Sequence, residues 1–122
     1  MIEYTVHNNG DKIWRLNGQL HREDGPAVEY ANGTKQWYIN GKYHREDGPA
    51  IEFANGTKQW WLTGQLHRED GPAVEWAYGY KTWYLHSKRY TKEEFLKQTQ
   101  PAEELTIAEI EQLLGFSIKI VK

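Results

Sequence analysis

The chain of 122 residues contains no cysteine and one methionine, and neither sign of charge is in large excess. Without cysteine it forms no disulfide, offers no thiolate to a metal and has no thiol nucleophile. It has no apolar run of the roughly 18 residues that a membrane-spanning helix needs, and no N-terminal stretch typical of a signal peptide. We therefore expect a cytoplasmic protein that does not enter the membrane.

Composition and motifs narrow the function classes. The net charge of −2 disfavours general nucleic-acid binding, which needs a clustered basic surface. An aromatic content of 14% indicates a folded domain rather than a disordered tail. The Gly-x-Ser-x-Gly elbow, the phosphate-binding glycine loop and the His-Glu-x-x-His motif are all absent. We expect a protein that is not an enzyme and needs no cofactor.

What the chain does contain is a repeat. The heptapeptide His-Arg-Glu-Asp-Gly-Pro-Ala occurs three times, always 23 residues apart, at residues 21–27, 44–50 and 67–73. The full units are residues 12–34, 35–57 and 58–80, with partial units at both ends. A unit of this size cannot bury its own apolar face, so the units must stack on one another.

Each unit contains residues that are typical of tight turns. Asn-Gly pairs and the Asp-Gly-Pro run separate apolar segments of four or five residues that are rich in β-branched and aromatic side chains. This pattern predicts a mainly β fold, an elongated repeat array of stacked β-hairpins that form a single twisted antiparallel sheet over residues 1–89. Residues 90–122 are expected to form a small C-terminal α/β cap.

The expected cap consists of helix, helix and strand. Thr91 and Glu94 form a capping box for the first helix, and Thr106 and Glu109 form one for the second. Gly115 is placed to end the second helix, and residues 116–120 alternate like a strand. The cap covers the end of the array or serves self-association, and the sequence leaves both open.

Alternation along the short segments divides their side chains into two sets. The more apolar set is expected to be buried and comprises Val28, Tyr30, Ile51, Phe53, Val74, Trp76 and the pairs Trp14/Leu16, Trp37/Ile39, Trp60/Leu62 and Trp83/Leu85. The equivalent tryptophans are expected to stack between units. The second set, which we call the outer ladder, consists of Arg15, Tyr38, Trp61 and Tyr84. Partly exposed aromatic residues are typical of binding hot spots, so the outer ladder is a candidate interaction surface.

The repeated His-Arg-Glu-Asp run is the other candidate site. Equivalent histidines are expected about 10 Å apart from the spacing of strands, which is too far to share a metal ion. Acid–base catalysis is open on chemistry alone, although three copies of one active site would be unusual. We expect a structural role in which each Asp accepts backbone N–H groups of the turn and each Arg pairs with a Glu. The alternative is that Arg22, Arg45 and Arg68 hold an anionic ligand.

The glycine-punctuated aromatic hairpins of 23 residues resemble the MORN and MORN-like repeat families. The sequence Trp-Tyr-Ile-Asn-Gly followed by His-Arg-Glu-Asp-Gly-Pro-Ala is similar to repeats in small proteins of tailed bacteriophages and their bacterial hosts. The resemblance implies stacked hairpins, a scaffolding or binding role, and a location in the bacterial cytoplasm.

Two functions are consistent with these features. The first is a non-enzymatic interaction protein that binds another protein through the outer ladder or the curved face of the sheet. The resemblance suggests, more specifically, a phage-borne inhibitor of a bacterial defence or host protein. The second is a protein that binds or sequesters a nucleotide or sugar between aromatic rings and the repeated arginines. Homodimerisation through a sheet edge, formed either by residues 2–6 or by residues 118–121, is a further alternative for either function.

Overall fold

The structure is a computed structural model that describes residues 1–100 and 107–115. The strands are β1 (Ile2–Val6), β2 (Lys12–Leu16), β3 (Gln19–Leu20), β4 (Val28–Glu29), β5 (Lys35–Gln36), β6 (Tyr38–Ile39), β7 (Lys42–Tyr43), β8 (Ile51–Glu52), β9 (Lys58–Gln59), β10 (Trp61–Leu62), β11 (Gln65–Leu66), β12 (Val74–Glu75), β13 (Lys81–Leu85) and β14 (Lys88–Tyr90). The helices are α1 (Lys92–Thr99) and α2 (Ile107–Leu114).

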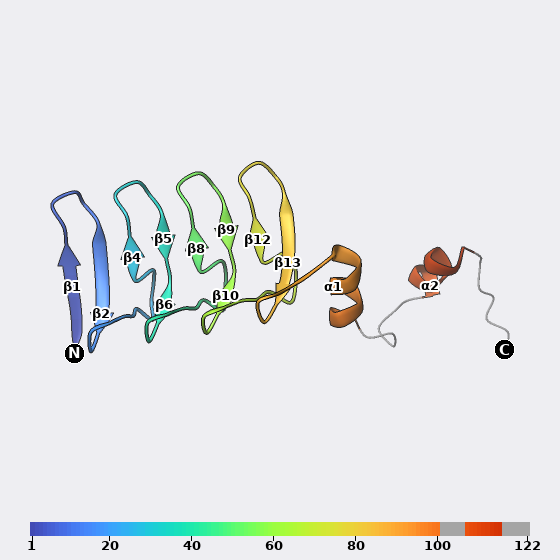
Figure 1. The fold of residues 1–122 in the computed structure, drawn as a ribbon, viewed down its shortest axis with the longest axis horizontal. Coiled ribbons are helices and arrows are strands. Elements are labelled where there is room, and N and C mark those ends of the chain that lie inside the picture. Colours follow the sequence, from blue (N-terminus) through green and yellow to red (C-terminus); the bar gives the residue numbers. More distant parts are fainter. Residues whose placement is uncertain (101–106, 116–122) are drawn as a thin grey trace.

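Most strands belong to one antiparallel sheet with the order β1-β2-β4-β5-β8-β9-β12-β13-β14, to which β3 is added through β2. The pairs β6-β7 and β10-β11 form separate two-stranded ladders. Figure 1 shows the upper hairpins β1-β2, β4-β5, β8-β9 and β12-β13 side by side, with the lower hairpins β2-β3, β6-β7, β10-β11 and β13-β14 along the other edge. The prediction of a mainly β array of antiparallel hairpins is confirmed.

The lower hairpins close on two residues of positive φ. Asn17 and Gly18 have φ of 51° and 82°, and the pairs at 40–41, 63–64 and 86–87 repeat this conformation. Two successive positive φ angles define the type I′ turn, whose twist matches that of the flanking strands. In the upper turns Gly33 has a φ of 98°, and the Asn32 side chain accepts the Thr34 N–H at 2.9 Å. The Asn-Gly pairs are therefore turns, as predicted.

The register corrects the predicted assignment of faces. Val28 pairs with Ile13 on one side and with Gln36 on the other, so these three side chains share a face. Trp14 follows Ile13 in β2 and therefore points to the opposite face. Val28 and Trp14 were expected on one buried side, and that prediction is wrong. A period of two relates residues within a strand but does not say how neighbouring strands are matched.

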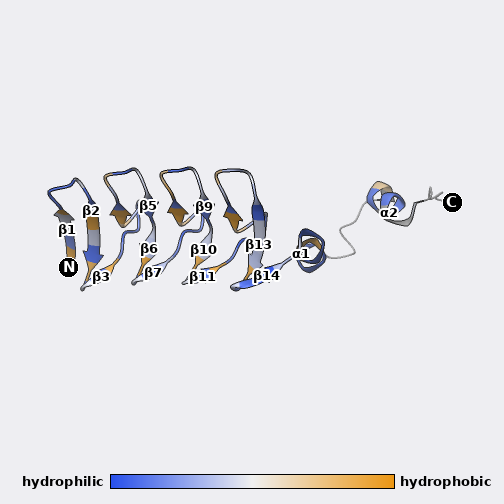
Figure 2. Cartoon of the chain, turned by 45° about the horizontal axis from the view of Figure 1, so that its top comes forward, coloured by the Kyte–Doolittle hydropathy of each residue, from blue (hydrophilic) through white to orange (hydrophobic). Residues whose placement is uncertain are grey.

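The hydrophobic core is thin. Among the described residues, the buried hydrophobic side chains are Ala27, Val28, Ala50, Ile51, Ala73, Val74 and Phe95. In Figure 2 the hydrophobic colour recurs at β4, β8 and β12, the strands that begin with the buried valine or isoleucine and lie beside β5, β9 and β13. Tyr30 and Phe53 were expected to be buried but are 40% and 36% exposed, because each lies beyond the end of its strand, where its N–H closes the upper turn. A single sheet cannot enclose the large side chains, so stability depends on contacts between units.

The repeated histidine joins one unit to the next. Nδ1 of His21 accepts the Asn40 backbone N–H at 2.9 Å, and the same bond links His44 to Thr63 and His67 to His86. Because Nδ1 is the acceptor, the ring carries its proton on Nε2, which lies 3.6 Å from a Glu23 carboxylate oxygen. The imidazole thus links adjacent lower hairpins through a hydrogen bond.

The upper turns carry a second set of bonds between units. The Thr34 hydroxyl accepts the Ala54 N–H at 3.0 Å, and the Thr57 hydroxyl accepts the Ala77 N–H at 3.1 Å. Asp11 takes the threonine position in the first upper turn and accepts the Ala31 N–H at 2.8 Å. Each hairpin is therefore tied to its neighbour near both ends.

The predicted first helix is α1, and it begins with the predicted capping box of Thr91 and Glu94. Its Phe95 is buried, and α1 contacts β13 and β14, the last strands of the array. Helix α2 is followed by Gly115 with a φ of 77°, as the predicted stop requires. The second capping box depends on Thr106, which lies outside the described residues, as do residues 116–120. No helix in the described part of the chain has the length and apolar character to span a membrane.

Replacing the buried His21 with Ala is expected to lower the free energy of unfolding by about 1 to 2 kcal/mol, because the Asn40 N–H loses the acceptor that links the two hairpins. Replacement with Asn should cost less, since a side-chain oxygen then stands near the position of Nδ1. Urea denaturation followed by tryptophan fluorescence measures both changes. Equal losses for the two variants would contradict a specific role for the Nδ1 bond.

The backbone N–H of Thr91 holds the pKa of Glu94 below its ordinary value, and the Thr91 side chain adds to this effect. A lowered folded-state pKa means that the capping contribution is complete above the pKa of the unfolded chain and is lost as pH falls through the folded pKa. We expect the start of α1 to fray in that acidic range, as measured by amide exchange of its first turn. The Glu94→Gln variant keeps an acceptor oxygen without titrating, so its α1 should show no such transition.

Candidate functional site

The lower hairpins place a continuous row of side chains along one face. Each hairpin contributes one pair of residues that face each other across its two strands, and cross-strand partners lie on the same face. The pairs are Arg15 with Leu20, Tyr38 with Tyr43, Trp61 with Leu66, and Tyr84 with Arg89. We call these residues the aromatic row. It runs through every lower hairpin and contains the whole outer ladder.

Aromatic contacts hold the centre of the aromatic row together. The rings of Tyr38 and Tyr43 stack with their centroids 4.4 Å apart, and Tyr43 lies 5.2 Å from the ring of Trp61 in the next hairpin. Gln36 accepts the Tyr38 hydroxyl at 3.3 Å, and Gln59 plays the same role for Trp61 Nε1 at 3.0 Å. The rings are thus fixed in position before any partner arrives.

The aromatic row is neither buried nor fully exposed. All of its residues are partly exposed except Arg89, which is exposed. Burial, followed by the neighbouring Tyr43, raises the pKa of Tyr38, so this phenol is neutral at physiological pH. The row therefore presents uncharged aromatic and aliphatic side chains between two terminal arginines.

The outer ladder predicted from the sequence accounts for half of this row. Sequence reasoning missed the other four: Arg89, at the end of the row, and Leu20, Tyr43 and Leu66, which lie between the predicted residues. A signal existed for the last three, since each directly precedes a His-Arg-Glu-Asp run. With a two-residue turn at 40–41, Tyr43 must face Tyr38.

The repeated arginines lie on the opposite face, where each is enclosed by its own unit. The guanidinium carbon of Arg45 lies 3.9 Å from the ring centroid of Trp37. Its Nε donates to Asp47 at 3.0 Å, and its Nη1 donates to the Pro49 carbonyl at 3.0 Å and to Glu52 at 2.9 Å. Arg22 and Arg68 cover Trp14 and Trp60 in the same way.

The glycine of the motif closes the other side of the guanidinium. A Cβ atom on Gly48 would lie 3.0 Å from the guanidinium carbon of Arg45, which is closer than nine in ten real Cβ contacts. Gly25 and Gly71 stand in the same relation to their arginines. Glycine is needed here for close approach and not for a positive φ. We call the sandwich of tryptophan, guanidinium and glycine the arginine stack.

The arginine stack tests three expectations. The expected pairing of each Arg with a Glu is confirmed, at 3.7, 2.9 and 2.8 Å for Glu29, Glu52 and Glu75. The Asp residues were expected to accept turn N–H groups and instead accept the arginine Nε, because the guanidinium lies inside the turn. The expected stacking of equivalent tryptophans is also wrong for the first three, whose partners are arginines.

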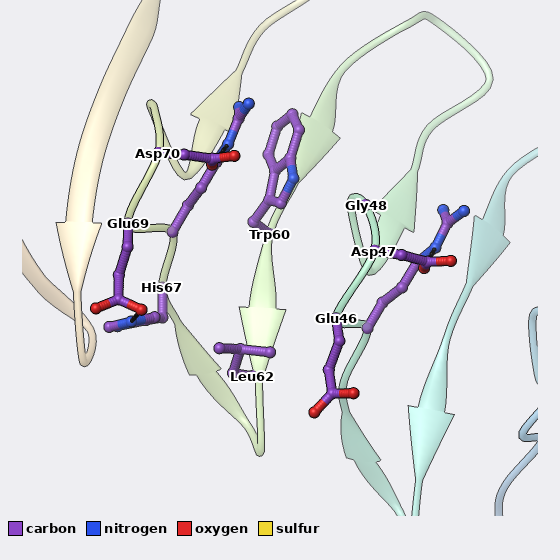
Figure 3. Close-up of a pocket in the computed structure, with 10 residues that line it drawn as sticks. Glu46, Asp47, Gly48, Trp60, Leu62, His67, Glu69 and Asp70 are labelled. Carbon is purple, nitrogen blue, oxygen red and sulfur yellow. Dashed lines mark hydrogen bonds and ion pairs between the residues drawn. The ribbon is translucent and has the colours of Figure 1, made fainter.

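A groove separates each His-Arg-Glu-Asp run from the next. In Figure 3, Trp60 and Leu62 lie between Glu46 and Asp47 on one side and the equivalent residues of the next unit, Glu69 and Asp70, on the other. This groove has a volume of about 620 Å³, and an equivalent groove one unit earlier has about 790 Å³. The Asp47 side chain is 86% exposed. Each groove is also lined by two arginines, but their donors are bound within their own units, so the exposed carboxylates make it unfavourable to an anion.

Across residues 1–100 and 107–115, no three His, Cys, Asp or Glu side chains are grouped so that they could hold a metal ion. Comparison of the chain with family models, curated proteins and solved structures finds no match in any of the three. The resemblance to MORN-like repeats therefore stays a prediction.

Replacing Arg45 with Lys is expected to lower the free energy of unfolding by about 2 kcal/mol, because an ammonium keeps the charge but loses the planar contact with Trp37 and part of the hydrogen-bond fork. The control Arg15→Lys, on the opposite face, should change stability by less than about 0.5 kcal/mol. Urea denaturation measures both.

Gly48→Ala adds a test of the sandwich itself. The added methyl group should displace the guanidinium and destabilise the array, although an alanine normally stabilises a compatible glycine position by reducing the entropy of the unfolded chain. A stabilised Gly48→Ala variant would contradict the close approach of Arg45.

Proposed function

We propose that this chain is a non-enzymatic repeat protein that binds another protein through the aromatic row. The observation that carries the proposal is the continuity of the row, to which every lower hairpin contributes a facing pair of side chains. Side chains buried only for stability need not form an unbroken, partly exposed strip across repeats.

The composition of the aromatic row suits a protein interface. Tyrosine, tryptophan and arginine dominate binding hot spots, and they cluster near the centre of an interface where water is excluded. Here Tyr38, Tyr43 and Trp61 form the centre, with Leu20 and Leu66 beside them and an arginine at each end. Rings that are already stacked lose little conformational freedom when a partner binds, which favours affinity.

The length of the aromatic row also matches a protein partner. Two strands per unit at the usual strand spacing give about 10 Å per unit and about 30 Å from the first to the last hairpin. A strip of this length can contact an extended segment or a flat patch on the order of 800 Å² per partner, as specific complexes require. A small molecule would touch only part of it.

The alternative of an anionic small ligand lacks a comparable support. The arginines that were candidates for it donate to Asp, Glu and a proline carbonyl within their own unit. The ring faces that a sugar or nucleotide would stack on are occupied, by Arg45 on Trp37 and by neighbouring rings in the aromatic row. Each open groove is lined by four carboxylates and by two arginines whose donors are already bound within their own units.

The partner is proposed to be a bacterial protein. This part of the proposal rests on the similarity of the repeat to those of small phage proteins, and it makes the chain an inhibitor that covers a functional surface of a host or defence protein. An elongated and pre-ordered strip is suited to occlusion, because it can cover a site without supplying any catalytic group.

The test is affinity capture from bacterial lysate with mass spectrometry, using matched variants of the tagged chain. We expect one protein to be captured in stoichiometric amount by the wild type, and at least tenfold less of it by the double variant Tyr38→Ala, Trp61→Ala. The control Tyr78→Ala removes an aromatic ring that is 76% exposed in an upper turn, outside the aromatic row, and should bind as the wild type does.

Circular dichroism and urea denaturation establish that the double variant still folds. If it keeps its fold and captures the same protein at wild-type level, the aromatic row is not the binding surface. If the wild type releases a nucleotide or sugar on denaturation and captures no protein, the chain is a ligand-binding protein instead.

A further inference from the structure

The first strand of the array has an unpaired and apolar edge. Strand β1 is the terminal strand of the sheet, and all five of its residues are exposed. Ile2, Tyr4 and Val6 are 68%, 51% and 57% exposed and alternate along the strand, so they form one apolar strip on one face. Edge strands usually carry lysine, proline or a bulge that blocks further pairing. In β1 the only charged residue is Glu3.

The hydrogen bonds to β2 determine which backbone groups of β1 are free. The Met1 carbonyl accepts the Asn17 N–H, and the His7 N–H donates to the Asp11 carbonyl. Odd-numbered residues therefore direct their N–H and C=O groups toward β2. In a strand the even-numbered residues must direct theirs the other way. The outer edge thus offers the N–H and C=O groups of Ile2, Tyr4 and Val6, with no acceptor or donor for them among the described residues.

The other end of the array differs. There the chain passes from β14 directly into α1, which contacts β13 and β14 and whose Phe95 is 3% exposed. The sheet therefore has one covered end and one end with a regular, unobstructed ladder edge. Because of this asymmetry, β1 is the edge at which a further strand can be added to the sheet.

We propose that β1 pairs with β1 of a second copy of this chain, antiparallel and with Tyr4 opposite Tyr4. In this register Ile2 of each copy faces Val6 of the other, and Glu3 faces Thr5. The three outward residues of both strands then form hydrogen-bonded pairs, which supplies six backbone hydrogen bonds by the antiparallel pattern, two for each of three pairs. The apolar strips of the two copies become neighbours on one face.

Neighbouring registers are poorer. Shifting the pairing so that Glu3 faces Glu3 brings two like charges together, which is destabilising across a strand pair. Shifting it the other way, so that Thr5 faces Thr5, leaves Ile2 of each copy without a strand partner. Odd shifts place outward N–H groups against inward ones and break the hydrogen-bond pattern. Only the pairing centred on Tyr4 satisfies both the backbone and the side chains.

The pairing also determines how the two copies present their surfaces. An antiparallel pair of strands is related by a twofold axis perpendicular to the sheet, so both copies turn the same face to the same side. A dimer therefore displays two aromatic rows on one face, and a partner with two sites would gain from both. The dimer itself does not depend on the proposed function of those rows.

Sedimentation equilibrium of the full chain tests the proposal, with a charge swap at the twofold axis as the decisive step. The wild type should dimerise in the micromolar range, since one strand pair forms a small interface. Tyr4→Lys and Tyr4→Glu should each be monomeric, because like charges meet across the axis. An equimolar mixture of the two should form a 1:1 heterodimer. Tyr78→Lys, in an upper turn away from β1, is the control and should dimerise like the wild type.

A wild type that stays monomeric up to millimolar concentration would overturn the proposal. So would single Tyr4 variants that still dimerise, since the interface would then lie elsewhere, or a mixture that remains monomeric while both variants are folded. Amide exchange gives an independent readout: in the dimer the N–H groups of Ile2, Tyr4 and Val6 should be protected at least tenfold relative to the Tyr4→Lys monomer, and equal exchange would contradict the pairing.

Discussion

The guanidinium of the repeated arginine is the group around which each unit is built. It lies between the tryptophan ring and the motif glycine, and its donors bind an aspartate, a proline carbonyl and a glutamate of the next strand. The other motif residues follow from this arrangement: the histidine joins the next hairpin, and the alanine before β8 is fully buried. A partly buried cation with every neighbour in place is costly to disturb, because removing one partner leaves the others unsatisfied. That constraint explains why the heptapeptide repeats without change while the residues around it vary.

The arginine stack leaves the opposite face free for variation. Along the aromatic row the equivalent position is Arg, Tyr, Trp and Tyr in successive hairpins, whereas the stack keeps the same residues in its three copies. A scaffold that is stabilised on one face can change its other face without losing its fold. This division is typical of repeat proteins, in which neighbour contacts carry stability and a continuous surface carries binding.

Charge organises the upper part of the sheet in a similar way. On the face of the arginine stack, lysines and glutamates of adjacent strands oppose each other in alternation, from Lys12 with Glu29 to Glu75 with Lys81. Every cross-strand pair in this ladder has opposite signs, which favours the observed register over a slipped one. At β1 the ladder stops, since Val6 lies opposite Lys12. The edge strand thus lacks the charges that specify pairing elsewhere, and its apolar residues and backbone groups determine what it pairs with.

The amino-acid sequence by itself determined the period, the hairpins, the antiparallel array and the first C-terminal helix, because these depend on local signals: positive φ at Asn17 and Gly18, short β-branched segments, and the capping box of Thr91 and Glu94. Tertiary structure alone decided which faces are formed. The sequence pattern places Val28 and Trp14 on one side, whereas the register places them on opposite faces. Tyr43 belongs to the aromatic row because its hairpin pairs it with Tyr38. The partners of Arg22 lie eight residues before it, at Trp14, and seven after it, at Glu29. No sequence period encodes such contacts, because they depend on how separate strands are matched and on the close approach that Gly25 permits.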